Sequence, residues 1–319
     1  MLIEQSLGKS LPREAAARGD RPPAAAAQPD RTGRGVPVNK ISIQEFTFAD
    51  VIGFGENAAA QAKREDVLRQ LSDWGIGNIE LFTLSGLSAT QMRALLDKYG
   101  MKASGRHVGT PTAPADLAKI LADNLILGIK DFGSGATPNY ATQAEWIAYA
   151  NYLDELGERA RKAGQTLMVH NHNWEFERQF ADISAYEALL AYTDPRNLEF
   201  QVDLYWSTRG LGTAVGATSV SQADDLLAEL VRRLGNPGPA VPRQGQVDDI
   251  PAPGSPTGAV PGRIEIVGAG GIDFPSIFAA STGPVKHYVI EHDPRFGDTS
   301  FDPFKAATAG FNYLSCVRY

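Results

Sequence analysis

The chain has 319 residues, of which 43% are hydrophobic and 21% charged, and this balance predicts a globular protein with a sizeable core. A formal net charge of -7 excludes the basic surface that nucleic-acid phosphates require. The single cysteine excludes an intrachain disulfide and a thiolate metal cluster. The sequence contains no run of about 18 apolar residues that would predict a membrane span. The expected setting is therefore a reducing cytoplasm, with neither nucleic acid nor membrane as partner.

Two stretches lack the features of a folded core. Residues 1–40 contain no aromatic residue and no β-rich run, so they cannot bury enough apolar area to offset the entropy lost on ordering. They also lack the 7–15-residue apolar stretch of a secretory signal. Residues 236–261 hold a concentration of the chain's 20 prolines and again no aromatic residue. The sequence predicts a disordered tail over residues 1–40 and a single domain over 41–319, with a Pro/Gly-rich flexible segment at 236–261.

Strand-like and helix-like patterns alternate along the rest of the chain. Short apolar runs predict strands at residues 41–46, 78–82, 102–107 and 129–132 and, with longer polar ends, at 167–176, 198–206 and 286–293. Helix-like runs lie at residues 58–74, 88–99, 115–125 and 142–163, the second of them opening on a possible capping box at Ser88. This alternation predicts a parallel sheet with right-handed crossovers. Eight units in about 280 residues favour a (β/α)8 TIM barrel over a doubly wound sheet.

The seventh unit is irregular in sequence. Most of the interval between the helix that ends near residue 234 and residue 264 is the proline-rich segment. Proline removes a backbone donor, so it weakens a central strand. Either residues 263–267 form a short seventh strand, or the barrel is imperfect there.

Ionisable residues stand at the ends of the last three predicted strands. These residues are His170 and His172, Asp203, and Glu291. In a parallel barrel the carboxyl ends of the strands build the active site, and alternate residues share a face, so the two histidines point the same way. A lone strand histidine is more often structural than a ligand. Five histidines at or beside strand ends make the two interpretations equally strong, and carboxylates converging with imidazoles favour a metal-assisted enzyme.

Four segments together resemble the sugar phosphate isomerase/epimerase family, which has the xylose isomerase-like TIM barrel. They are Val169-His-Asn-His-Asn-Trp-Glu-Phe176, Val202-Asp-Leu-Tyr-Trp206, Val267-Gly-Ala-Gly-Gly-Ile-Asp-Phe274 and Tyr288-Val-Ile-Glu-His-Asp293. The segments occur in the family's order, and the resemblance spans about residues 40–319.

The resemblance implies one bound divalent ion, which could be Mn, Zn, Co or Mg. The family's ligands on the fifth, sixth and eighth strands map onto His170, Asp203 and Glu291. Its seventh-strand histidine has no counterpart, because no histidine lies between His172 and His287. At most three protein ligands remain, which predicts weaker metal binding and an enzyme impaired by the missing ligand, unless Asp248 or Asp249 replaces it.

The resemblance also implies catalytic groups. Glu291, with His170 or His172 opposite, would transfer protons next to a carbonyl. An imidazole in place of the carboxylate that many members have shifts the expectation towards elimination.

Other positions would bind substrate. Glu80 and His107 would contact hydroxyls, and Trp174 and Trp206 would form a stacking wall. The alternatives are structural: Glu80 could pair with a barrel lysine or arginine, both tryptophans could be core residues, and Glu175 could cap a loop.

The sequence thus predicts an isomerase or epimerase that acts on a small sugar, sugar derivative or polyol ketone. One alternative is a carbon–oxygen lyase of the inosose dehydratase type. Another is a non-catalytic sugar-binding or partner barrel that lost a metal ligand. An oligomer is compatible with any of them.

Overall fold

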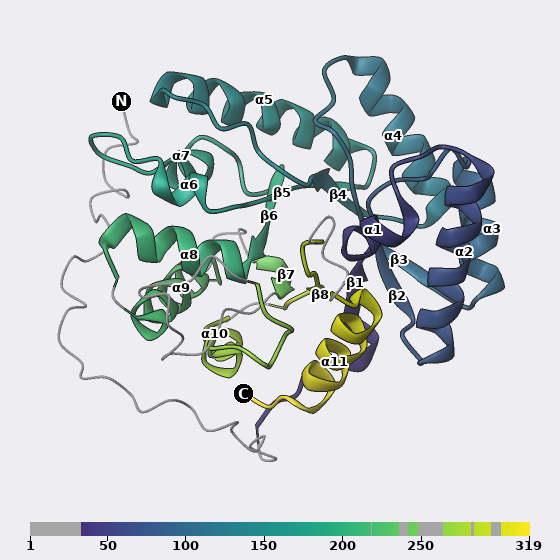
Figure 1. The fold of residues 1–319 in the computed structure, drawn as a ribbon. Helices are drawn as coiled ribbons and strands as arrows, with labels where there is room; N and C mark the ends of the chain where they lie inside the picture. The colour runs from purple at the N-terminus through teal and green to yellow at the C-terminus, as the bar shows by residue number, and fades with distance from the viewer. Residues whose placement is uncertain (1–32, 218, 236–241, 248–263, 282–283, 295–300) are drawn as a thin grey trace.

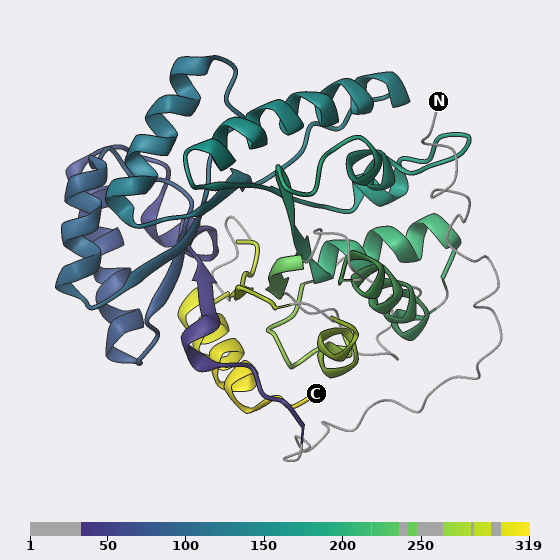
Figure 2. The same cartoon turned by 180° about the vertical axis from the view of Figure 1, so that it is seen from behind.

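Parallel strands form a curled sheet at the centre of the computed structural model, which describes residues 33–217, 219–235, 242–247, 264–281, 284–294 and 301–319. The strands are β1 (Ile41–Gln44), β2 (Asn78–Leu81), β3 (Lys102–His107), β4 (Asp131–Ser134), β5 (Thr166–His170), β6 (Leu198–Asp203), β7 (Pro242–Val247) and β8 (His287–Ile290). Helices surround them in both views (Figure 1, Figure 2). The expected α/β class is confirmed.

The helices follow the strands in chain order. The longer ones are α2 (Ala58–Asp73), α3 (Ala89–Lys98), α4 (Pro114–Leu127), α5 (Gln143–Lys162), α8 (Leu204–Val215), α9 (Val220–Gly235) and α11 (Pro303–Cys316). The shorter ones are η1 (Val38–Lys40), η2 (Glu45–Phe48), α1 (Ala49–Ile52), α6 (Trp174–Glu177), α7 (Ala185–Ala191) and α10 (Phe274–Ala280). The capping box predicted at Ser88 is confirmed, with Gln91 as its partner.

Strand pairing follows the order of the chain. Each strand pairs in parallel with the next, and β8 pairs with β1, so the pairings close on themselves. Alternate residues divide between two environments. Ile41 and Ile43 belong to the hydrophobic core, whereas Ser42 bonds Ser104 of β3, with 2.7 Å between the two hydroxyl oxygens. The strand side chains that point into the barrel are therefore polar, and those on the outer face of the strands are apolar.

The seventh strand lies within the proline-rich segment. Pro242–Val247 forms β7, paired with β6 and β8, inside the segment 236–261 for which the sequence predicts flexibility. The alternative in which residues 263–267 form the seventh strand is not the one found, because Glu265 is assigned an isolated bridge. The reason is the spacing of the prolines. Residues 243–250 contain none, and Pro242 stands at the first strand position, where a missing donor is tolerated.

The expected tail ends earlier than residue 40. Arg34 and Tyr319 exchange backbone hydrogen bonds of 2.8 and 2.9 Å, and the Arg34 guanidinium lies 4.8 Å from the centroid of the Tyr319 ring. Val36 is 4% exposed and belongs to the core. Residues 33–36 and the C-terminus thus form a terminal clamp. Composition missed it because its partner lies almost 300 residues away, and residues 1–32 and 248–261 lie outside the described residues.

No helix in the described part of the chain is both long and apolar enough to cross a membrane. The cytoplasmic setting stays a prediction.

Candidate functional site

Polar side chains fill the barrel interior near the carboxyl ends of the strands. Gln44 at the end of β1 donates to Oε2 of Glu80 at 2.6 Å, and its Nε2 lies 3.3 Å from Nδ1 of His107. Glu80 and His107 also approach each other directly, at 3.3 Å. Gly135 leaves room for the imidazole, because a Cβ there would lie 2.8 Å from Nδ1 of His107. Three neighbouring strands therefore supply one hydrogen-bonded group.

Gln201 of β6 crosses the interior and connects this group to β5. Its Nε2 donates to Oε1 of Glu80 at 2.8 Å, and its Oε1 lies 2.7 Å from Nε2 of His107 and 3.1 Å from Nδ1 of His170. Because an amide oxygen can only accept, both ring nitrogens must carry protons. His170, when neutral, then has its lone pair on Nε2. The network thus orients His170 as a metal ligand requires.

His170, Asp203 and Glu291 form a buried cluster in which one ligand atom from each lies within 4.8 Å of the others. Asp203 Oδ1 accepts from the Trp206 backbone at 2.6 Å, but Oδ2 is buried without a hydrogen-bond partner. Nε2 of His170 lies 3.9 Å from this oxygen. Two lone pairs therefore face each other across a gap too long for a hydrogen bond, which is the arrangement expected around a cation.

Burial is the main electrostatic influence on these carboxyl groups. It raises the pKa of Glu291 well above its usual value, and the neighbouring charges of Asp293, Asp203 and Glu80 add to the effect. Burial also raises the pKa of Asp203 well above the ordinary range, and it raises that of Asp293 to about 6. The pKa of Glu80 is raised by burial against the opposing influence of His107. Acidic groups are thus concentrated here, and no lysine or arginine among the described residues is among the causes that shift the pKa values of Asp203 and Glu291.

An aromatic group lies on the β5–β6 side of the site. The His172 ring stacks on Trp174 at 4.3 Å and 8° between planes, and Trp206 lies 5.5 Å from it. Nδ1 of His172 is buried without a hydrogen-bond partner. Burial and then the nearby His107 lower the pKa of His172 to about 4, so the imidazole is neutral. Both tryptophans are half-buried and pack against the core.

Glu175 fixes this aromatic group in place. Its Oε2 accepts the His172 backbone N–H at 2.9 Å, and its Oε1 accepts from the Thr137 hydroxyl. The Trp174 indole donates to the same hydroxyl at 3.0 Å. Burial raises the pKa of Glu175 to about 7. These contacts show Glu175 capping a loop, which is the structural role given above as the alternative for this residue.

The structure brings together the residues selected from sequence. Glu80, His107, His170, Asp203 and Glu291 share one polar interior, and Asp203 and Glu291, which the resemblance implies as ligands of one ion, lie close together. Among the described residues, Glu80 contacts Gln44, Gln201 and His107 and pairs with no lysine or arginine. Asp248 and Asp249 lie outside the described residues.

Sequence reasoning missed four contributors. They are Gln44, Thr137, Gln201 and Asp293. Gln201 shares a strand face with Asp203, so alternation could have found it. Neutral Gln44 and Thr137 carried no such signal.

The remaining two histidines lie elsewhere. His292 donates its backbone N–H to Thr47 and stacks on Phe301 at 4.3 Å. His287 begins β8, at the opposite end of the barrel, and burial lowers its pKa.

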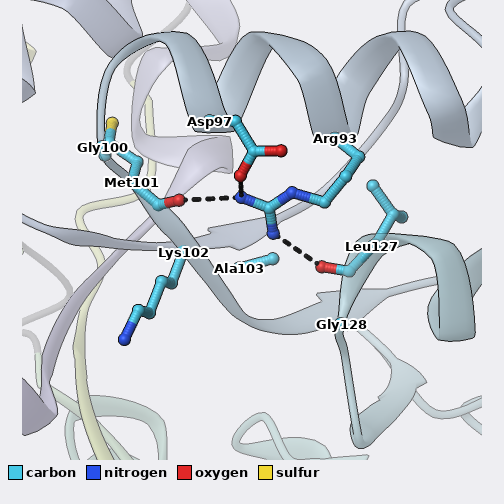
Figure 3. Close-up of a pocket in the computed structure, with 8 residues that line it drawn as sticks. All are labelled: Arg93, Asp97, Gly100, Met101, Lys102, Ala103, Leu127 and Gly128. Atoms are coloured by element: carbon cyan, nitrogen blue, oxygen red, sulfur yellow. Dashed lines mark hydrogen bonds and ion pairs between the residues drawn. The ribbon is translucent and has the colours of Figure 1, made fainter.

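A separate cavity of about 450 Å³ opens at the amino end of β3 (Figure 3). It is lined by Arg93, Asp97, Gly100, Met101, Lys102, Ala103, Leu127 and Gly128. Arg93 donates to the carbonyls of Leu127 and Met101 at 3.0 and 3.1 Å and pairs with Asp97 at 2.5 Å. Its guanidinium connects α3 to the neighbouring chain segments, so the cavity has a structural explanation and is remote from the carboxyl-end cluster.

Comparison with solved structures agrees with the resemblance seen in sequence. The chain superposes on a sugar phosphate isomerase/epimerase from Parabacteroides distasonis ATCC 8503 with a TM-score of 0.63 and 17% identity, over 92% of this chain and 98% of the other. For the IOLI protein, described with a binding zinc atom, the TM-score is 0.55 and the identity 15%, over 86% and 98%. For the probable 3-DHS dehydratase AsbF of Bacillus anthracis they are 0.56 and 13%, over 86% and 98%.

These superpositions show that the chain shares its fold with xylose isomerase-like TIM barrel proteins, and the identities are too low to show more. No family model matches the chain. No curated protein matches it either.

Proposed function

We propose that this chain is a divalent-metal-dependent isomerase or epimerase, acting on a small sugar, sugar derivative or polyol ketone at the carboxyl end of a (β/α)8 barrel. The observation that carries the proposal is the buried cluster of His170, Asp203 and Glu291, whose ligand atoms lie within 4.8 Å of one another. Burying such a set costs free energy unless a cation compensates the charge.

The cluster fits a divalent ion on its own geometry. Oδ2 of Asp203 lacks a hydrogen-bond partner, and the lone pair of His170 Nε2 faces it. One imidazole and two carboxylates suit Zn or Mn, and Co and Mg are to be tested beside them. Such an ion supplies Lewis-acid polarisation of a substrate carbonyl. The three protein ligands leave positions for substrate oxygens.

The protein's own groups would then handle protons. Glu291, in its ionised form, would take the proton from the carbon beside the carbonyl. His170 belongs to the proposed ligand set and His172 does not, so His172 would be the histidine that exchanges a proton on the other side of the substrate. Its lowered pKa keeps the imidazole neutral and able to accept. Returning the proton to the neighbouring carbon gives isomerisation, and returning it to the opposite face gives epimerisation.

Glu80 and His107 would hold the substrate's hydroxyl groups. Their buried network with Gln44 and Gln201 provides both donors and acceptors at fixed positions. Trp174 and Trp206 would cover the C–H face of the sugar and exclude water from the proton-transfer groups.

Elimination is the second candidate reaction. A structural neighbour is described as a probable dehydratase, and a proton-transfer group beside the carbonyl also suits loss of water. Glu291 would remove the proton beside the carbonyl. The β-hydroxyl would leave as water with the proton that Glu291 has taken up, and a carbon–carbon double bond would form.

Metal analysis and solvent-exchange measurements test both candidates. We expect about one divalent ion per chain after supplementation with Mn, Zn, Co or Mg. We also expect deuterium incorporation from D2O beside the carbonyl of at least one member of a keto-sugar and inosose panel. Elimination would instead show as loss of one water from the substrate mass.

The matched variants are Asp203→Asn and Asp66→Asn, the latter on an exposed stretch of α2. Asp203→Asn should lose the ion and the exchange, and Asp66→Asn should keep both. If the wild-type chain takes up no ion and exchanges no proton, the enzyme proposal fails and the non-catalytic sugar-binding barrel is favoured.

A further inference from the structure

Three phenylalanines form an apolar group at the rim of the site, outside the hydrophobic core. The ring centroids of Phe46 and Phe82 lie 4.8 Å apart, and Phe54 lies 6.5 and 6.3 Å from them. Phe54 is 61% exposed and the other two rings are half-buried. None of the three belongs to the core cluster or packs against it among the described residues. We name them the rim phenylalanines.

The rim phenylalanines stand directly beside the polar interior. Phe46 follows Gln44 by two residues and donates its backbone N–H to the Gln44 side chain at 3.1 Å. Phe82 follows Glu80 by two residues, just beyond the end of β2. Since Gln44 and Glu80 bond each other in the interior, the two rings mark the rim above that pair.

A second aromatic group lies across the barrel from them. Gln201 of β6 reaches Glu80 of β2 through the interior at 2.8 Å, so the β1–β2 and β5–β6 sides face each other. His172, Trp174 and Trp206 occupy the latter side. The polar interior is therefore flanked by aromatic surfaces from opposite directions.

This arrangement divides recognition into two chemistries. Carboxylates, imidazoles and amides of the interior suit hydroxyl groups, and one aromatic surface suffices to stack on a small sugar ring. The rim phenylalanines add a surface with no polar atom, in continuity with the site. An exposed apolar cluster bordering a polar site is typical of a ligand-binding surface.

We propose that the rim phenylalanines are a subsite for an apolar substituent, so that the substrate is a glycoside with a ketone on its sugar ring and an apolar or aromatic aglycone. The choice of a sugar for the polar interior rests on the proposed function, and the apolar subsite rests on the placement of the three rings. Ring stacking there should tighten binding of a phenyl group over a methyl group roughly threefold to tenfold.

Equilibrium binding of two glycosides tests the subsite. The probes are phenyl and methyl β-D-glucopyranoside, which share the sugar and differ in the substituent, measured by calorimetry and saturation-transfer NMR. We expect the wild-type chain to favour the phenyl glycoside by the stated ratio. Phe54→Ala should bring the ratio close to one, and Phe54→Leu should leave it intermediate. Leu125→Ala, at a 78% exposed position of α4, should leave it unchanged.

Several results would overturn the subsite. A wild-type ratio near one, a ratio unaffected by Phe54→Ala, or no binding of either glycoside would each do so. Sedimentation of the same variants tests the other possible occupant of the rim, a second copy of this chain. If Phe54→Ala turned an oligomer into a monomer and left the ratio intact, the rings would form a subunit interface.

The test separates the subsite from the proposed function, because the ratio requires no turnover. Asp203→Asn should lose the metal and solvent exchange and retain the phenyl preference. Loss of preference in a wild-type chain that still exchanges protons would remove the subsite alone. A chain with the preference but without metal or exchange would remove the proposed enzyme activity alone.

Discussion

The two ends of the barrel bury acidic groups in opposite ways. At the amino end, Lys286 pairs with Asp131 of β4 and lies 3.0 Å from Glu199 of β6. At the carboxyl end, Asp203 and Glu291 lie together, and no lysine or arginine among the described residues pairs with them. The same residue types thus stabilise the fold at one end, where a cation of the protein compensates them. At the other end the described residues supply no such cation, which is the arrangement expected of a binding site.

The largest expected effect is at the uncompensated end. Glu291→Gln should lower the rate of solvent exchange by about 100-fold or more, because it removes both a ligand and a proton-transfer group. Manganese at 100 times its Kd should stabilise the wild-type chain by about 2.7 kcal/mol and the variant by much less. Exchange rates and thermal scans with and without Mn²⁺ measure both effects. An equal metal-induced rise in Tm in the variant would contradict the ligand assignment.

The compensated end should respond in stability alone. Lys286→Met leaves Asp131 and Glu199 buried without their cation, which should cost about 3–5 kcal/mol in the free energy of unfolding. Urea denaturation measures the loss. Lys162→Met, at an exposed lysine of α5, is the control and should change stability by less than about 1 kcal/mol. A loss of bound metal in a folded Lys286→Met protein would contradict the claim that the amino end affects stability alone.

A pH effect should come from the carboxyl end. Burial raises the pKa of Glu175 from 4.5 to about 7 in the folded chain. Between these values the unfolded chain loses a proton that the folded chain keeps. Stability should therefore fall as the pH rises from about 4.5 to 7, by at most about 3 kcal/mol, and then level off.

Glu175→Gln tests this sign. The variant should lack that part of the pH dependence of the unfolding free energy, and Glu187→Gln, in the capping box of α7, should retain it. A variant that loses stability over the same pH window as fully as the wild type would show that Glu175 is not the responsible group.

The smallest effect concerns the terminal clamp at the amino end. Deleting residues 1–36 removes two backbone hydrogen bonds and the buried Val36, which should cost about 2 kcal/mol. The control is deletion of residues 1–32, which we expect to leave Tm unchanged. Thermal scans of the two truncations compare them. Equal Tm values would mean that the clamp contributes nothing to stability.

The sequence could predict what depends on local pattern. The ends of the apolar runs placed His170, Asp203 and Glu291 at the carboxyl end of the strands, and the capping box at Ser88 followed from two residues three apart. Contacts between residues far apart in the chain could not be predicted from the sequence. Nothing local in Gln201 indicates that it joins three strands, and nothing in Arg34 indicates a partner at Tyr319. The seventh strand was missed because a proline count over 26 residues hid the proline-free window inside it.

The terminal clamp has a consequence for the connectivity of the chain. Gly35 and Arg318 form an antiparallel bridge, so residues near the two ends of the described chain already lie side by side. A short Gly/Ser linker from Tyr319 back to Gly33 could join them into a covalent circle without straining the folded protein. Such a circle would restrict the unfolded chain far more than the folded one, and the closure entropy of a loop of nearly 290 residues would then favour folding.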